Sequence, residues 1–180
     1  HWKVDTGRGR IGFTADDDME RAVAEMAEAC ALPGLVPVGV FTHFAAADST
    51  APEDIAYTRR QYDILCAAVE EMAARGCTFA VKHCCNSAGT FAWPEFHLDM
   101  VRPGIALYGV GADAQRLDLR PVMSLKSSVS TIKTFDPGTD VSYGRTFRTQ
   151  GRTRIGVLPI GYADGFFRGL SNRMSVVTAQ

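Results

Sequence analysis

The sequence predicts an α/β chain that forms the second half of a (β/α)8 TIM-type barrel, followed by the start of an antiparallel β domain. Near-continuous apolar strands first alternate with segments of helical periodicity, which is typical of a parallel sheet covered by helices. These strand–helix units are too few to close a barrel of eight, which needs about 200–250 residues. From Arg116, apolar and polar residues alternate as in antiparallel strands with one wet face. A small open doubly wound sheet is the alternative for the first part.

The domain boundary is expected between Asp113 and Pro121, which gives a first domain over 1–116 and a second over 117–180. In the first domain, carboxylates at 16–18 cap a helix that Pro33-Gly34 ends, and Gly76 closes a longer amphipathic helix. The expected strands are 1–5, 36–44, 78–82 and 99–109, the expected helices follow 16–18 and span 53–75, and a short helix runs through Phe91 and Trp93. The second domain is expected to place strands at 125–135, 152–157 and 174–178.

Composition excludes several classes of protein. The net charge of −1 gives no basic surface for nucleic acid, and no apolar run is long enough for a membrane span. The 5 cysteines form no CxxC pattern, which favours reduced thiols in a cytoplasmic protein and no metal site. Because the chain starts at His1 inside a strand pattern, we expect it to be an internal segment of a longer protein.

Polar side chains follow each expected strand of the first domain. They are Lys3, Asp5 and Arg10; His43; Asn86 and Ser87; and Arg102 with Gly104. The carboxyl ends of parallel strands meet at one edge of a sheet, so these groups are expected to converge there. Basic side chains, a hydroxyl and open backbone amides together suit a phosphorylated cofactor or an anionic substrate. Each residue alone has a structural explanation, such as a helix cap for Ser87.

The stretch Asp99 to Gly109, DMVRPGIALYG, carries the most informative of these residues. A guanidinium inside an apolar run is costly unless it meets an anion or hydrogen-bond acceptors. Pro103 and Gly104 directly after Arg102 turn the backbone and leave amides open. The alternative for Arg102 is a strand-end side chain that reaches solvent.

Six motifs follow one another along nearly the whole chain: KVDTGRGRIGF, THFAAADS, NSAGT, DMVRPGIALYG, VSYGRTF and IGYADGF. Together and in this order, they resemble alanine racemase, a fold-type III pyridoxal-phosphate enzyme. The resemblance implies a cytoplasmic homodimer that racemises L- and D-alanine and supplies D-alanine for peptidoglycan. This chain would be the second half of the pyridoxal-phosphate-binding barrel plus the beginning of the C-terminal β domain.

The resemblance also implies cofactor contacts. Arg102 matches the arginine that hydrogen-bonds the pyridine nitrogen of pyridoxal phosphate, and His43 matches the histidine that braces it. Ser87, Gly104 and Ile105 match the positions that hold the phosphate. A guanidinium does not give up its proton, so the pyridine stays unprotonated and is a weaker electron sink, which favours racemisation.

Four further residues match positions around the substrate. Tyr143 matches the catalytic tyrosine that reaches into the site of the other subunit, and Arg10 matches the arginine of the substrate carboxylate. Lys3 matches a lysine that is often carbamylated, and Tyr162 matches a tyrosine of the substrate access path. An unperturbed tyrosine titrates near 10, so Tyr143 needs nearby cations to act as a base.

The chain departs from the family pattern in three places. Arg8 replaces a usual methionine, and Cys84-Cys85 replaces a less reactive pair. The motif with the lysine that binds the cofactor covalently does not occur, so we expect the isolated segment to be inactive. Two alternatives stay open: a racemase of serine or of broad specificity, and a non-catalytic barrel fragment that assembles with a complementary half.

Overall fold

The computed structural model describes residues 1–111 and 117–178. The chain forms two compact units, His1–Met123 and Ser124–Gln180. The expected boundary between Asp113 and Pro121 falls partly on residues 112–116, which lie outside the described residues.

The first unit is built on a parallel sheet. Its strands are β1 (Trp2–Asp5), β2 (Phe13–Thr14), β3 (Gly39–Phe41) and β4 (Val81–His83), in the order β2-β1-β3-β4. All three pairings are parallel, as predicted from the apolar runs, although β2 was not expected. A Cβ at Gly39 would lie 2.7 Å from the carbonyl oxygen of Val81, so this glycine permits the close approach of β3 to β4.

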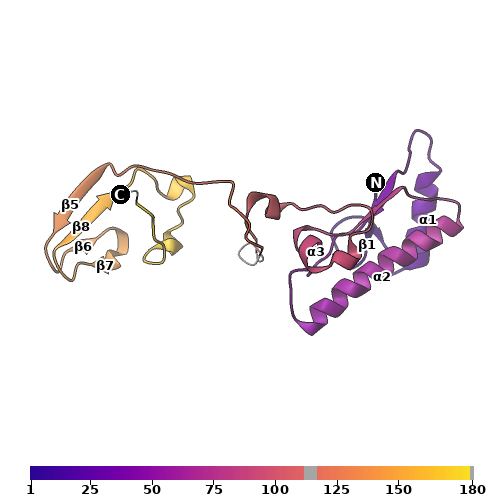
Figure 1. The fold of residues 1–180 in the computed structure, drawn as a ribbon, viewed down its shortest axis with the longest axis horizontal. Coiled ribbons are helices and arrows are strands. Elements are labelled where there is room, and N and C mark those ends of the chain that lie inside the picture. Colours follow the sequence, from indigo (N-terminus) through magenta and orange to yellow (C-terminus); the bar gives the residue numbers. More distant parts are fainter. Residues whose placement is uncertain (112–116, 179–180) are drawn as a thin grey trace. The chain divides into compact units, whose positions relative to one another are not determined.

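The helices of this unit, α1 (Met19–Cys30), α2 (Pro52–Ala74) and α3 (Ser87–Ala92), occur where the sequence predicts them, and Figure 1 shows them around β1. The Asp18 carboxylate caps α1 by accepting the amide proton of Arg21 at 3.0 Å. The Asn86 side chain caps α3 in the same way. After α2, Gly76 adopts a φ of 81°, the left-handed conformation that ends many helices.

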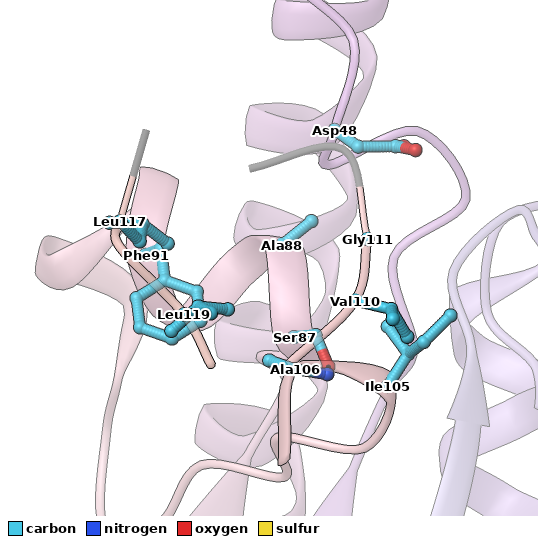
Figure 2. A pocket seen from close by; sticks show the side chains of 10 residues that line it. All are labelled: Asp48, Ser87, Ala88, Phe91, Ile105, Ala106, Val110, Gly111, Leu117 and Leu119. Carbon is cyan, nitrogen blue, oxygen red and sulfur yellow. Dashed lines mark hydrogen bonds between the residues drawn. The ribbon is translucent and has the colours of Figure 1, made fainter. Parts of the chain in front are cut away.

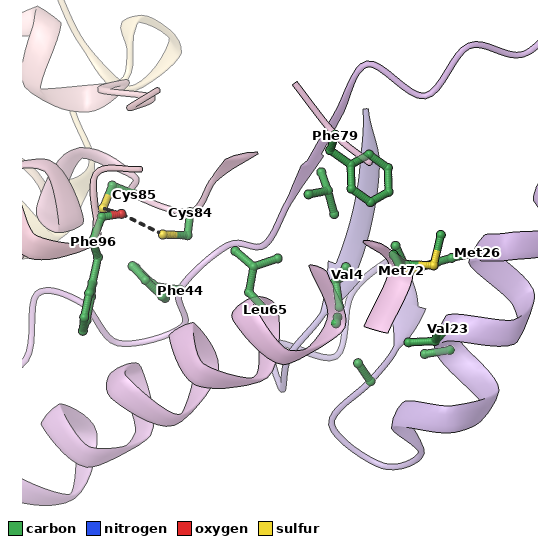
Figure 3. Close-up of a cluster of buried hydrophobic side chains, with 14 of the residues drawn as sticks. Val4, Val23, Met26, Phe44, Leu65, Met72, Phe79, Cys84, Cys85 and Phe96 are labelled. Carbon is green, nitrogen blue, oxygen red and sulfur yellow. Dashed lines mark hydrogen bonds between the residues drawn. The ribbon is translucent and has the colours of Figure 1, made fainter. Parts of the chain in front are cut away.

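The hydrophobic core lies between the sheet and the helices. From β1, β3, α1 and α2 it receives fully buried side chains that include Val4, Val40, Val23, Met26, Leu65 and Met72. Figure 3 shows that the same cluster continues through Phe44 to Cys84, Cys85 and Phe96. Burial of each large side chain contributes about 1.5–3 kcal/mol, so this packing fixes the positions of the strand ends.

A buried polar network joins two of these strand ends to α2. The hydroxyls of Thr6, after β1, and Thr42, after β3, lie 2.7 Å apart. Gln61 on α2 donates from Nε2 to the Thr6 hydroxyl at 3.2 Å, and its Oε1 accepts the amide proton of Ala45 at 2.9 Å. All three side chains are fully buried. The network therefore holds the loops after β1 and β3 in a fixed relation.

The strand expected over 99–109 is wrong. Residues 99–102 run beside β4 with only isolated backbone bonds, from Asp99 N–H to the Lys82 oxygen and from Arg102 N–H to the Cys85 oxygen, both at 3.0 Å. Ile105–Tyr108 then form the 3-10 helix η2. Pro103 has no amide to continue a ladder, and the amide of Leu107 donates to the Gly104 oxygen and closes the turn instead.

The second unit contains two antiparallel strand pairs, which agrees with the predicted change to antiparallel structure. β5 (Thr131–Phe135) pairs with β8 (Thr153–Val157), and β6 (Asp140–Val141) pairs with β7 (Phe147–Arg148). The strand expected at 174–178 is wrong, since those residues have no regular structure. In β5 the residues Thr131–Thr134 are exposed and only Phe135 is partly buried.

Short 3-10 helices complete the two units: η1 (Pro94–Phe96), η3 (Tyr143–Arg145), η4 (Tyr162–Asp164) and η5 (Arg168–Leu170). None of the helices in the described part of the chain has the length and apolar character needed to cross a membrane.

Replacing Gln61 tests the buried polar network. Gln61→Leu removes the acceptor of the Ala45 amide and one donor to the Thr6 hydroxyl, so we expect the free energy of unfolding to fall by about 1–3 kcal/mol. Urea unfolding followed by helical ellipticity measures this, because α1 and α2 lie in the first unit. The exposed Gln150→Leu is the matched control and is expected to change stability by less than about 0.5 kcal/mol. Equal effects of the two variants would contradict a structural role for the network.

Candidate active site at the carboxyl ends of the parallel strands

The loop after β1 is wrapped around one buried carboxylate. Asp5 Oδ1 accepts amide protons from Gly7, Arg8 and Gly9 at 2.9–3.1 Å, and Oδ2 accepts the amide proton of Arg10 at 3.0 Å. Burial pushes the pKa of Asp5 up, but the amides and the Lys3 ammonium outweigh it and hold the pKa below its usual value. The carboxylate thus fixes the backbone positions from which the Arg8 and Arg10 side chains extend.

Lys3 lies on β1 and is almost entirely buried. Its ammonium donates to the carbonyl oxygen of Ile11 in the same loop. Burial, reinforced by the charges of Arg10, Arg8 and Arg102, lowers the pKa of Lys3, although Asp5 opposes the shift. Lys3 therefore loses its proton at a lower pH than a surface lysine does.

His43 follows β3 and is half-buried. Burial first, and then the charges of Arg8, Arg102, Arg10 and Lys3, lower its pKa to about 4, so the ring is neutral at pH 7. Arg8 spans the same region, since its Nη1 donates to the Phe44 oxygen at 3.1 Å. These four cations around one neutral imidazole make this edge of the sheet a place that favours anions.

Arg102 turns back over the ends of β3 and β4. Its Nη2 donates to the carbonyl oxygens of Thr42 at 2.9 Å and Cys84 at 3.2 Å, and its Nη1 contacts Nδ1 of His83. The guanidinium carbon also lies 5.2 Å from the centre of the Phe41 ring. The side chain is half-buried, so the alternative in which it reaches bulk solvent does not hold.

The contact with Arg102 fixes the protonation of His83. A guanidinium only donates, so His83 Nδ1 must accept and its proton sits on Nε2. Nε2 lies 2.8 Å from Nδ1 of His1, which serves as the acceptor. Burial and the Arg102 charge lower the pKa of His83 to about 4, and its ring stacks 4.9 Å from that of Phe41. His83 is therefore the neutral imidazole that orients the guanidinium.

Ser87 begins α3 and meets the turn that follows Arg102. Its hydroxyl accepts the amide protons of Gly104 at 2.8 Å and Ala106 at 3.3 Å. A hydroxyl that accepts two bonds still has its own proton to donate. Figure 2 shows Ser87, Ala106 and Ile105 at one wall of a pocket whose other lining residues include Phe91 and Val110. The arrangement places a hydroxyl and backbone amides beside a largely apolar pocket.

Tyr143 and Tyr162 lie in the second unit, where they begin η3 and η4, and both are exposed. Ser142 and Arg145 on either side of Tyr143 adopt positive φ values of 64° and 54°. Arg145 donates from Nε to Asp140 at 2.8 Å, which ties the turn to β6. The expected role of Tyr143 at a site of another subunit stays a prediction.

Of the expected site residues in the first unit, Lys3 lies inside β1, Arg10, His43 and Arg102 lie in loops, and Ser87 begins α3. The resemblance implied that His43 braces Arg102, but the imidazole bonded to this guanidinium is that of His83, which sequence reasoning missed. The sequence does place His83 at the end of an apolar strand, β4. This strand lies beside β3, which His43 follows.

The two depressed histidine pKa values predict how stability depends on pH. Between pH 6.5 and about 4 the unfolded chain binds protons that the folded chain excludes, so the free energy of unfolding falls as pH falls through this window. Urea unfolding of the first unit at pH 7.5 and pH 5 measures the loss. His43→Gln and His83→Gln are each expected to reduce it. An unchanged pH dependence in both variants would mean that the neutral imidazoles are not its source.

Comparison with known proteins matches both halves of the chain. Residues 1–112 match the family described as alanine racemase, N-terminal domain, and residues 122–180 match alanine racemase, C-terminal domain. An alanine racemase of Desulforamulus reducens is 44% identical over 98% of this chain and 47% of its own length. The chain thus spans about half the length of the curated relatives it matches.

Solved structures give the same result. Alanine racemase of Clostridium difficile is 40% identical with a TM-score of 0.79, covering 93% of this chain and 44% of its own. That of Streptomyces coelicolor is 38% identical with a TM-score of 0.78, covering 91% and 43%. The parallel sheet and the antiparallel strands therefore match part of the alanine racemase structures. On these matches and this geometry, the chain belongs to the alanine racemase family.

Proposed function

We propose that this chain is the part of a pyridoxal-phosphate-dependent alanine racemase that holds the ring nitrogen and the phosphate of the cofactor. The whole enzyme would interconvert L- and D-alanine. The observation that carries the proposal is the guanidinium of Arg102, oriented by two carbonyls and His83 beside the Ser87 hydroxyl and the Gly104 turn. The relatives named above, which are alanine racemases, support it.

The donor set on the described residues fits this cofactor. Arg102 has five N–H groups and stays charged at all working pH values, so an N–H left over from its protein contacts can donate to an unprotonated pyridine nitrogen. Ser87 and the amide of Ile105 would hold the phosphate, and so would the Gly104 amide, which in this structure donates to the Ser87 hydroxyl. When bound, the cofactor supplies the electron sink that acidifies the α-proton of the amino acid.

Arg10 would bind the substrate carboxylate. Its backbone amide is bonded to Asp5, so the side chain extends from a fixed backbone position. The side chain itself is exposed. Lys3 lies on the strand before the same loop, and its lowered pKa favours the neutral amine that reacts with carbon dioxide to form a carbamate. A carbamate would reverse the charge at Lys3 and give Arg10 an anionic partner.

Tyr143 would move a proton to or from one face of the substrate α-carbon, and Tyr162 would line the access path. Alanine racemases are typically homodimeric. We propose that Tyr143 serves the site of the other subunit, as the family pattern implies. The base for the opposite face would be the cofactor-binding lysine, for which this sequence has no matching motif.

The chain alone is expected to form no covalent bond to the cofactor. Its lysines are Lys3, Lys82, Lys126 and Lys133, and none lies in the expected motif. Incubation with pyridoxal phosphate, borohydride reduction and peptide mass mapping measure this. A stoichiometric reduced adduct at one of these lysines, absent with pyridoxine phosphate, which has no aldehyde, would contradict the assignment.

Removing the Tyr143 hydroxyl tests the proposed activity. A chimera in which this chain replaces the matching segment of the Desulforamulus reducens relative provides the whole enzyme. Tyr143→Phe is expected to lower kcat by about 10²–10⁴-fold, because it removes an acid–base group. Tyr62→Phe removes a hydroxyl from α2 and is the matched control with near-normal turnover. The role is overturned if the chimera folds and binds cofactor but racemises alanine equally well with and without the Tyr143→Phe substitution.

A further inference from the structure

A pair of cysteines lies at the ends of the two long helices, away from the strand ends that carry the site. Cys30 is the last residue of α1, and Cys77 follows the Gly76 turn that ends α2. The Cys77 thiol donates to the Cys30 sulfur with an Sγ–Sγ distance of 2.7 Å. A disulfide bond is about 2.05 Å long, so the two sulfurs need to approach by only roughly 0.7 Å to bond.

Neighbouring groups hold both sulfurs in place. The indole Nε1 of Trp2 donates to Cys30 Sγ at 3.2 Å, which fixes this sulfur from the amino-terminal end of β1. The amide of Cys77 donates to the Met72 oxygen at 3.0 Å, which anchors Cys77 to the last turn of α2. The pair is thus held by the packing of α1, α2 and β1 rather than by one loop.

The other cysteines differ in access or in partner. Cys84 and Cys85 are fully buried in the core, out of reach of a dissolved oxidant. Cys66 lies on α2 and bonds the side chain of Tyr62. Cys30 and Cys77 are both partly exposed and have each other as sulfur partners, so a small reagent can reach this pair.

We propose that Cys30 and Cys77 form a reversible disulfide when the protein meets a low-molecular-weight disulfide such as glutathione disulfide. The thiolate of Cys30 attacks one sulfur of the reagent, forms a mixed disulfide and releases one thiolate. Cys77 then loses its proton and attacks the Cys30 sulfur, which releases the second thiolate. The two thiol protons end on the two released thiolates, so one disulfide is reduced as one is formed.

The position of the pair determines what the bond would do. In parallel α/β units the helices run opposite to the strands, so helix carboxyl ends lie by the amino-terminal ends of the strands, and the contact of Cys30 with Trp2 agrees with this. Arg102 and Ser87 belong to the opposite edge. The bond would therefore stabilise the first unit without changing the candidate site, and this inference stands whatever reaction the site performs.

The experiment uses the 180-residue chain, reduced and then incubated with glutathione disulfide, acid-quenched and alkylated. Intact mass and peptide mapping are expected to show a loss of about 2 Da and one cross-linked peptide that joins Cys30 to Cys77. Burial and the Cys30 thiol raise the pKa of Cys77 to about 11, so the bond is expected to form faster at pH 9 than at pH 7. The oxidised chain is expected to melt about 5–10 °C higher.

Two variants control the assignment. Cys66→Ser keeps the paired sulfurs and should cross-link like the parent chain, whereas Cys77→Ser should stop at a mixed disulfide on Cys30. Repeating the reaction in concentrated urea should scramble the pairing, because selectivity comes from the packed helices. The proposal is overturned by cross-linking that favours other cysteines, by persistent mixed disulfides on both residues, or by a chain that lacks helical ellipticity and pairs its thiols at random.

Discussion

The guanidinium of Arg102 is a charge taken partly out of water and surrounded by neutral acceptors. Its contacts are two strand-end carbonyls and one imidazole, with no carboxylate among the described partners. Such a charge is stabilised by good hydrogen bonds but not neutralised. The end of the sheet therefore keeps a net positive potential that an electron-rich or anionic group can satisfy. This positive potential affects the protonation of the histidines around it.

The two histidines at this edge show the effect. Both have a pKa of about 4, and in each the causes are burial followed by arginine charge. A protonated His83 would present Nδ1–H to a guanidinium that also has only protons to offer. Its neutrality is thus required for Arg102 to keep its orientation. Asp5 offsets only part of this positive potential, because its single negative charge faces the cations of Lys3, Arg8, Arg10 and Arg102.

Sequence reasoning succeeded where the signals are local. The Asp18 cap and the Gly76 turn define the two long helices, and alternation predicted antiparallel strands in the segments that hold β5 and β8. The apolar residues after Arg102 suggested a strand, although Pro103 ends any ladder there. His83 was missed because its role depends on a partner 19 residues away that only the fold brings near. Alternation predicted one solvent-exposed face for the strands of the second unit, whereas in β5 residues on both faces are exposed and only Phe135 is partly buried.

The buried network of Thr6, Thr42 and Gln61 explains why the two loops of the site keep their relation. Thr6 directly follows Asp5, whose carboxylate fixes Arg10, and Thr42 supplies the carbonyl that receives Arg102. The bond between their hydroxyls therefore links the loop proposed to bind the substrate to the arginine proposed to bind the cofactor. Gln61 adds the rigid helix α2 to the same link. A change on α2, well inside the core, can thus displace Arg10 and Arg102 at once, so stability and the geometry of the candidate site are coupled through three neutral side chains.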